Sequence, residues 1–319
     1  MDEATRALLR RGRGVGYDRN IAPVFEDFGL LPPSSYAEFA IAFDDYDENL
    51  KNAIIARLRF LSGIGRPTLQ FRHVEGTLVD PRSMADMLNA IRGRIQPLEI
   101  DPLKVTRYQI VAAHIVELEE EERTLVFIDV NYSEPTRFFE TFEGPQIVNP
   151  VASFTLRFDE GTSNVDIVGY EPYVGPITDD LLQQTRIHWE RRGDRLMLGD
   201  PLRLSRGWVL ELLRRYPARV SSAAGATTDP VARRISLRAD QEHDILDVTN
   251  RRLHGIEIVI GGNTTEFDVD LVRVNFTIDF RPITVHINVR TNKLMYYQYL
   301  THEYLGIVLD ALRALFAVG

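Results

Sequence analysis

Residues 124–132 read Thr-Leu-Val-Phe-Ile-Asp-Val-Asn-Tyr, and this run is the strongest indication of how the chain folds. β-branched and aromatic side chains fill it, as is typical of a β-strand. Four glutamates precede it at 119–122, and residues 107–118 before them form another strand-like stretch. The two stretches therefore predict a long hairpin that is closed by an acidic turn.

The same pattern recurs along the chain. A second hairpin is predicted from residues 153–158 and 165–169, with a turn at 161–164. Further strands are predicted at 68–72, 256–260, 267–280, 284–289 and 294–300. Strands that follow one another through short turns pair antiparallel, so the pattern favours an antiparallel sheet over a doubly wound parallel one.

Helical patterns flank these strands. Asp45 with Glu48 three residues later matches a capping box, and an apolar stripe follows it up to Leu61. Further helices are predicted at 80–95, 179–192 and 206–216, and the chain ends in an amphipathic helix from about residue 302.

The predicted fold class is therefore α+β. Residues 1–65 are expected to form a helical N-terminal domain. Residues 66–319 are expected to form an α+β domain of long antiparallel strands flanked by helices. Small and polar residues at 221–230 predict a flexible loop within that domain.

The composition narrows the class of protein. The chain has 319 residues, no cysteine and 44% hydrophobic residues, which is enough for a packed core. It contains no run of eighteen apolar residues and no apolar signal core near Met1, so neither a membrane span nor export is expected. The absence of cysteine also fits a reducing compartment. We therefore expect an intracellular protein, cytoplasmic or nucleoid-associated.

Candidate catalytic groups are few. The seven histidines form neither HxH nor HExxH, so each is expected to be structural or solvent-exposed. Glu266, Asp268 and Asp270 alternate along a predicted strand and share one face, which suits either a divalent metal or, more simply, solvent. The glycine-rich run at 12–16 follows a helix and lacks the residues of a phosphate loop. We therefore predict no enzyme activity, no catalytic residue, no metal and no cofactor.

The clustering of arginine is the remaining feature of the sequence that indicates a function. The net charge is −9, yet residues 186–219 hold nine arginines against four acidic residues. Guanidinium groups bind phosphate, so a nucleic-acid surface is one interpretation, and ordinary helix-end charge or pairing with the acidic hairpins is the other. The predicted nucleic-acid-binding residues are Arg10, Arg11, Arg13, Arg186, Arg191, Arg192, Arg195, Arg214 and Arg215.

Some stretches resemble a known family. The run 67–73, Pro-Thr-Leu-Gln-Phe-Arg-His, and the hairpin that ends at 127–133 are similar to the kinetochore proteins CENP-N and CENP-L. Residues 271–274, 291–294 and 302–309 are similar to the end of CENP-L. The resemblance covers about residues 67–319 and implies a non-enzymatic protein that binds DNA or chromatin proteins, for example in chromosome segregation. It also implies pairing with a like subunit through the C-terminal sheet.

The expected partners are therefore double-stranded DNA or chromatin proteins, and a second like subunit as a homodimer or heterodimer. The long strands at 267–280 and 284–289 are the expected dimer surface, since an unpaired strand edge there invites a partner. Two other classes stay open. A structural protein of a phage or secretion machine is predicted to form rings or fibres, and a helix-and-sheet cup is predicted to hold a small ligand.

Overall fold

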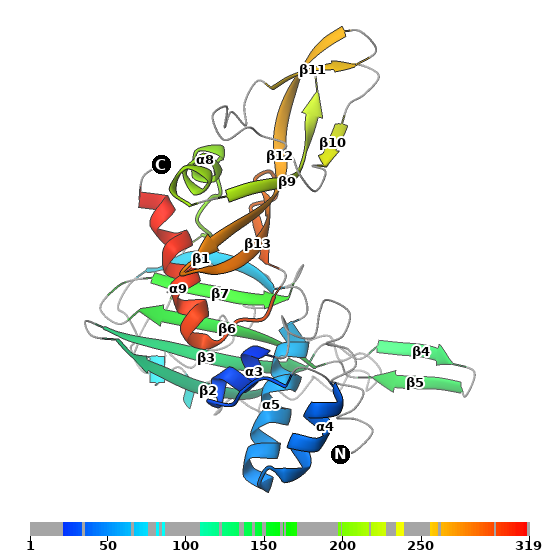
Figure 1. Cartoon of the computed structure of the whole chain (residues 1–319), viewed down its shortest axis with the longest axis vertical. Helices are drawn as coiled ribbons and strands as arrows, with labels where there is room; N and C mark the ends of the chain where they lie inside the picture. The colour runs from blue at the N-terminus through cyan, green and yellow to red at the C-terminus, as the bar shows by residue number, and fades with distance from the viewer. Residues whose placement is uncertain are drawn as a thin grey trace. The chain divides into compact units, whose positions relative to one another are not determined.

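The computed structural model of the protein describes the N-terminal helices, most strands and the C-terminal helix (Figure 1). The described residues are 22–33, 36–64, 67–75, 81–82, 85–86, 109–120, 123–133, 137–141, 144–148, 151–159, 162, 164–170, 197–198, 200–216, 218–227, 234–238, 256–260, 263–296 and 298–317. The chain forms two compact units. Unit 1 is residues 1–67, 71–200 and 299–304, and unit 2 is residues 68–70, 201–298 and 305–319.

Unit 1 is built on the two predicted hairpins, and both are confirmed. Its strands are ordered β1-β7-β6-β3-β2. Their bounds are Pro67–Glu75 (β1), Gln109–Glu119 (β2), Thr124–Ser133 (β3), Val151–Asp159 (β6) and Asn164–Tyr170 (β7). The short β8, Met197–Leu198, pairs with the end of β1, and β4, Arg137–Thr141, forms a separate hairpin with β5, Gly144–Val148.

The two faces of this sheet differ in chemistry. Residues that are paired across strands share a face, and successive residues alternate. Ile128 pairs with Leu156, and Leu156 pairs with Ile167 on its other side, so one face is apolar. Asp129 pairs with Thr155 on the other face, which also carries the buried ion pair of Arg157 and Asp166. The central strands therefore bury polar groups on one side only.

Three helices of unit 1 precede the sheet. They are α3 (Ala22–Asp27), α4 (Tyr36–Asp45) and α5 (Glu48–Ile64), and their core contains Phe25, Phe43, Ile54 and Leu58. The predicted cap at Asp45 is wrong because α4 extends through that residue. Instead, the Asp47 carboxylate accepts hydrogen bonds of 2.9 Å from the backbone N–H groups of residues 49 and 50.

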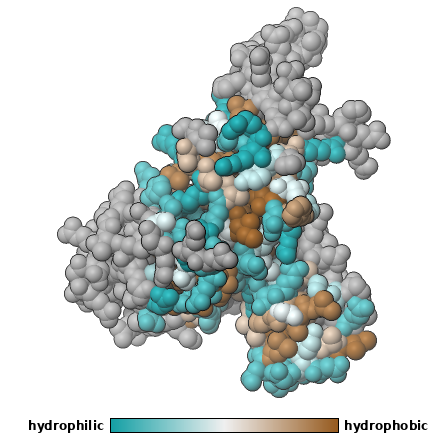
Figure 2. Space-filling model, turned by 60° about the vertical axis from the view of Figure 1, so that its left-hand side comes forward, coloured by the Kyte–Doolittle hydropathy of each residue, from teal (hydrophilic) through white to brown (hydrophobic). Residues whose placement is uncertain are grey.

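This helical region also carries apolar side chains on its surface. Leu31 is 92% exposed and Ile41 of α4 is 70% exposed. Figure 2 shows hydrophobic residues among hydrophilic ones at its lower end, where the N-terminal helices lie in Figure 1. The contacts group residues 1–67 with the strands of unit 1, whereas the sequence suggested a separate helical domain.

Unit 2 contains the second part of the antiparallel sheet, with strands ordered β10-β9-β12-β13-β14-β1 and β11 paired to the first half of β12. The bounds are Ala218–Thr227 (β9), Arg234–Arg238 (β10), Ile256–Ile260 (β11), Asn263–Ile278 (β12), Arg281–Asn288 (β13) and Lys293–Tyr296 (β14). Only residues 68–70 of β1 belong to this unit, through pairing with β14.

Two expectations for this unit are wrong. Residues 221–227, predicted to be a flexible loop, form most of β9, which pairs with β10 on one side and β12 on the other. The unpaired edge expected at 267–280 and 284–289 is absent where the described strands pair on both sides, at residues 271–276 of β12 and 285–288 of β13. β12 lies between β9 and β13, and β13 lies between β12 and β14.

The helices of unit 2 pack on its apolar sheet face. Helix α8 (Arg206–Arg215) is capped by Ser205. The Ser205 hydroxyl accepts a 3.0 Å hydrogen bond from the backbone N–H of Trp208. The Trp208 ring lies 5.7 Å from that of Phe316, in the 3₁₀ helix Ala314–Ala317 that follows α9 (His302–Arg313). The predicted C-terminal helix is thereby confirmed.

The α+β class is likewise confirmed, with a large antiparallel sheet and flanking helices. In the part of the chain that the structure describes, no helix has the length and apolar character needed to cross a membrane.

Candidate functional site

The predicted arginine site is described only in part. Arg10, Arg11, Arg13, Arg186, Arg191, Arg192 and Arg195 lie outside the described residues. Arg214 and Arg215 form the last turn of α8 and are exposed. The structure therefore gives surroundings to two of the nine predicted residues.

Arg214 makes a local ion pair on α8. Its Nε and Nη2 atoms donate to the two carboxylate oxygens of Glu211 at 2.7 and 2.6 Å. The hydrogen bonds and charge of Glu211 raise the pKa of Arg214, and the hydrogen bond from Arg214 lowers the pKa of Glu211. Because the Arg214 side chain is 72% exposed, this is a solvated surface pair of small energetic value.

A second group of cations, which the sequence analysis missed, lies on the sheet of unit 2. In β12, Val272, Val274 and Phe276 are buried, whereas Arg273 between them is exposed. Residues that pair with the outward-facing positions share their face. This surface, called the basic sheet face below, contains Arg219, Arg273, Asn275, Thr277, Thr284, His286, Asn288 and Lys293.

The register of the strands defines this face. Asn275 pairs with Arg219 of β9 on one side and with Thr284 of β13 on the other, and the Thr284 hydroxyl donates to the Asn275 side chain at 2.8 Å. Arg273 pairs with His286, and Asn288 pairs with Lys293 of β14. Three permanent cations and a histidine thus lie across four neighbouring strands, a width of about 14 Å at the usual strand spacing.

Acidic residues are absent from most of these strands. β9, β13 and β14 contain neither Asp nor Glu, and all three acidic residues of β12 precede Leu271. Unit 2 as a whole has 15 Lys and Arg against 12 Asp and Glu, whereas unit 1 has 22 against 34. The charge of −9 therefore divides into +3 for unit 2 and −12 for unit 1.

The α8 arginines and the basic sheet face lie on opposite sides of unit 2. Tyr216, which follows α8, contacts the buried ring of Phe276 with ring centroids 6.0 Å apart. Helix α8 therefore covers the face that bears Phe276, while Arg219, only four residues after Arg215, lies on the other face. The cluster at 186–219 does not form a single surface, because the sheet separates its members.

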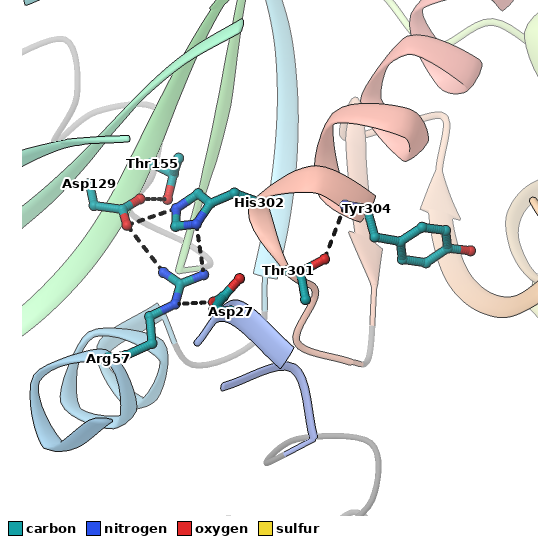
Figure 3. A network of polar contacts seen from close by, with 7 residues as sticks. All are labelled: Asp27, Arg57, Asp129, Thr155, Thr301, His302 and Tyr304. Atoms are coloured by element: carbon teal, nitrogen blue, oxygen red, sulfur yellow. Dashed lines mark hydrogen bonds and ion pairs between the residues drawn. The ribbon is translucent and has the colours of Figure 1, made fainter. Parts of the chain in front are cut away.

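Unit 1 holds a different polar arrangement, a buried ion network (Figure 3). Arg57 of α5 is its centre: Nε donates to Asp27 at 2.7 Å and Nη1 donates to Asp129 at 3.1 Å. Asp129 of β3 also contacts Nε2 of His302 at 2.9 Å and accepts from the Thr155 hydroxyl at 2.7 Å. The network joins α3, α5, β3, β6 and the first residue of α9.

The contacts of His302 define its proton positions. Arg57 only donates, so its Nη2, 3.4 Å from Nδ1, makes a hydrogen bond when Nδ1 carries no proton. Nε2 then carries the proton and donates to Asp129. The imidazole also packs edge-on against Phe127 at 5.1 Å. Both ring nitrogens thus face protein groups, which suits anchoring of the segment around His302 rather than proton exchange with a ligand.

Asp129 stays ionised in this site. Burial raises its pKa, but the interactions with His302 and Arg57 and the Thr155 hydrogen bond together outweigh burial and hold the pKa below its ordinary value. The sequence contained a signal for this network. An aspartate in the middle of Leu-Val-Phe-Ile-Asp-Val has to find a buried partner. Nothing in the sequence identified Arg57 and His302 as those partners.

The acidic trio on β12 gives no metal site. The side chains of Glu266 and Asp268 lie outside the described residues, and Asp270 stands at a register shift between Val269 and Leu271. Among the residues that the structure describes, no group of three His, Cys, Asp or Glu side chains is arranged to hold a metal ion.

No protein-family model matches the chain, and no curated protein matches it significantly. Any functional conclusion therefore depends on the chemistry of the two sites above.

Proposed function

We propose that the protein is a non-enzymatic DNA-binding protein that contacts the phosphates of double-stranded DNA through the basic sheet face of unit 2, with little sequence preference. The observation that carries this proposal is the placement of Arg219, Arg273 and Lys293 on strands that, from Leu271 on, contain no acidic residue. Guanidinium and ammonium groups bind phosphate, and such contacts position a protein without reading the bases.

The distribution of charge supports this surface over others. A chain of net charge −9 is repelled by DNA at long range, so binding needs a local concentration of cations. A stretch of duplex about 14 Å long carries about eight phosphate charges on its two strands together, and the face meets those on its side of the duplex. Arg219, Arg273 and Lys293 also have partners within the protein, so phosphate has to replace part of those interactions.

The resemblance to CENP-N and CENP-L leads to the same kind of partner, DNA or chromatin proteins, and to a role in chromosome organisation or segregation. A nucleoid-associated location follows from this proposal. Dimerisation through the C-terminal sheet stays a prediction, and residues 271–276 of β12 and 285–288 of β13 already pair on both sides within the chain. The mass of the protein in solution, measured by light scattering, tests it.

The test compares two surfaces of unit 2. A labelled duplex of about 30 base pairs is titrated at about 50 and about 200 mM salt, with binding followed by fluorescence anisotropy. Three contacts predict a slope of log affinity against log salt of about −2.7. Arg273→Glu together with Lys293→Glu is expected to abolish binding.

The matched control is Arg214→Glu together with Arg215→Glu, which reverses two charges on α8 at the other side of the sheet. We expect this variant to bind with a salt slope within about 1 of the unmodified protein. If the α8 variant loses binding and the sheet variant keeps it, the interface is on α8. If the unmodified protein does not bind at low salt, the proposal is wrong.

A further inference from the structure

The hairpin between β12 and β13 has an unusual tip. Ile278 pairs with Arg281, so Asp279 and Phe280 alone form the turn. Both have positive φ, 45° and 60°, as in the turn type that suits the twist of a hairpin. Asn-Gly and Asp-Gly are preferred there, because a side chain larger than that of Asn or Asp is strained in this region. Phenylalanine at the second position is therefore an outlier.

The same residue is also exposed. Phe280 has 97% of its surface open to solvent, the highest value among the exposed large hydrophobic residues that the structure describes. Glycine at this position would remove both the backbone strain and the exposed apolar ring. Strain of this kind persists where a residue is needed for a purpose other than stability. An exposed aromatic ring at the tip of a paired hairpin is suited to contact a partner.

We propose that Phe280 stacks on DNA bases, and that the preferred ligand of the protein is DNA with unpaired bases next to duplex. This inference rests on the proposed function, since β12 and β13 carry both the tip and part of the basic sheet face. The charges of Asp279 and Arg281 cancel, so the tip has no net charge and contacts the DNA through the Phe280 ring. Arg273 and its neighbours bind phosphates while Phe280 contacts a base.

The size of the effects favours unpaired bases over an intact duplex. Stacking of one base on an aromatic side chain changes affinity roughly 5- to 150-fold. Inserting the Phe280 ring between paired bases first requires those bases to unstack. The free energy of unstacking is about as large as the free energy that one stacked ring contributes. A bubble or single-stranded gap has already opened the stack, so there the ring contributes its full effect.

The experiment uses the full chain and two probes of the same length. One is a duplex of about 30 base pairs, and the other has a central bubble of about six mismatches that contains 2-aminopurine. Anisotropy gives affinity, and quenching of 2-aminopurine fluorescence reports stacking directly. The variants are Phe280→Ala, Phe280→Trp as the conservative replacement, and Arg273→Glu with Lys293→Glu.

We expect the unmodified protein and Phe280→Trp to prefer the bubble roughly 5- to 150-fold and to quench its fluorescence. Phe280→Ala should bind both probes with duplex affinity and without quenching. Equal binding of both probes by the unmodified protein would overturn this inference and leave the proposed function intact. Failure to bind either probe overturns both. A Phe280→Ala variant that changes only the mass of the protein in solution identifies the tip as a protein contact and also overturns the inference.

Discussion

The two units of this protein use their charged residues in opposite ways. Every Asp, Arg and His side chain that is buried among the described residues belongs to unit 1, as do the ion pairs Arg57–Asp27, Arg57–Asp129 and Arg157–Asp166. Apart from Thr68, the described core of unit 2 is apolar, and the arginine side chains described there are partly or fully exposed. The comparison indicates that charge lies inside unit 1, where it links helices and strands, whereas the described charged side chains of unit 2 lie at its surface.

The largest effect is expected from Arg57→Met. The substitution keeps the apolar stem but leaves the carboxylates of Asp27 and Asp129 without their cation, at side-chain exposures of 14% and 8%. Removing one member of a buried pair costs about 3–5 kcal/mol. Urea unfolding measures the loss. The matched control is Arg214→Met on α8, which removes an exposed pair and should leave the unfolding midpoint unchanged.

An equal effect of the two substitutions would remove the distinction between the units. It would mean that the network around Arg57 is solvated in solution like the surface pair on α8.

A second effect concerns the loss of unfolding free energy at low pH. The pKa of Asp129 is lower in the folded protein than its ordinary value of 3.8, so the folded state binds fewer protons at this site than the unfolded state. The stability that Asp129 contributes is complete above about pH 4 and is lost as the pH falls through the folded-state pKa. Between about pH 5 and 3, the unmodified protein should therefore lose more unfolding free energy than Asp129→Asn.

Urea unfolding at several pH values measures this difference. Parallel curves for the two proteins would show that Asp129 has the same pKa in the folded and unfolded states.

The smallest effect is expected at the hairpin tip of unit 2. Phe280→Gly relieves the positive φ and should raise stability by about 0.5–1 kcal/mol, after the greater freedom of glycine in the unfolded chain is subtracted. Thermal unfolding is the measurement, with Thr277→Gly in the adjoining strand as a control that should destabilise. A loss of stability in Phe280→Gly would mean that the Phe280 ring packs on the protein.

Local patterns in the sequence predicted the strands and helices better than they predicted which residues contact one another in the folded protein. The hairpin at 109–133 followed from its β-branched runs and acidic turn. Strand β9 was missed because Ser-Ser-Ala-Ala-Gly-Ala has low strand preference, and pairing with β10 and β12 overrides that preference. The partners of Asp129 were missed because they lie 72 and 173 residues away in the chain.

The candidate binding surface shows the same limit. Arg214, Arg215 and Arg219 are close in the sequence and therefore form one predicted cluster. The strand register, however, determines which residues share a face of the sheet. Arg219 shares a face with Arg273 because Arg219 pairs with Asn275, which follows Arg273 by two residues in β12, and this depends on the pairing of β9 with β12. No property of residues 186–219 alone contained that information.

The position of His302 in the chain affects how unit 1 is made in the cell. Asp129 and Arg57 leave the ribosome long before the histidine, which follows Asp129 by 173 residues. At about 5–20 residues per second, the wait lasts roughly 9–35 s. During that time Asp129, which is buried in the folded protein, lacks its hydrogen bond from His302. The network around Asp129 is therefore completed late in the synthesis of residues 1–302, and a nascent chain stalled before residue 302 should be a good substrate for chaperones and proteases.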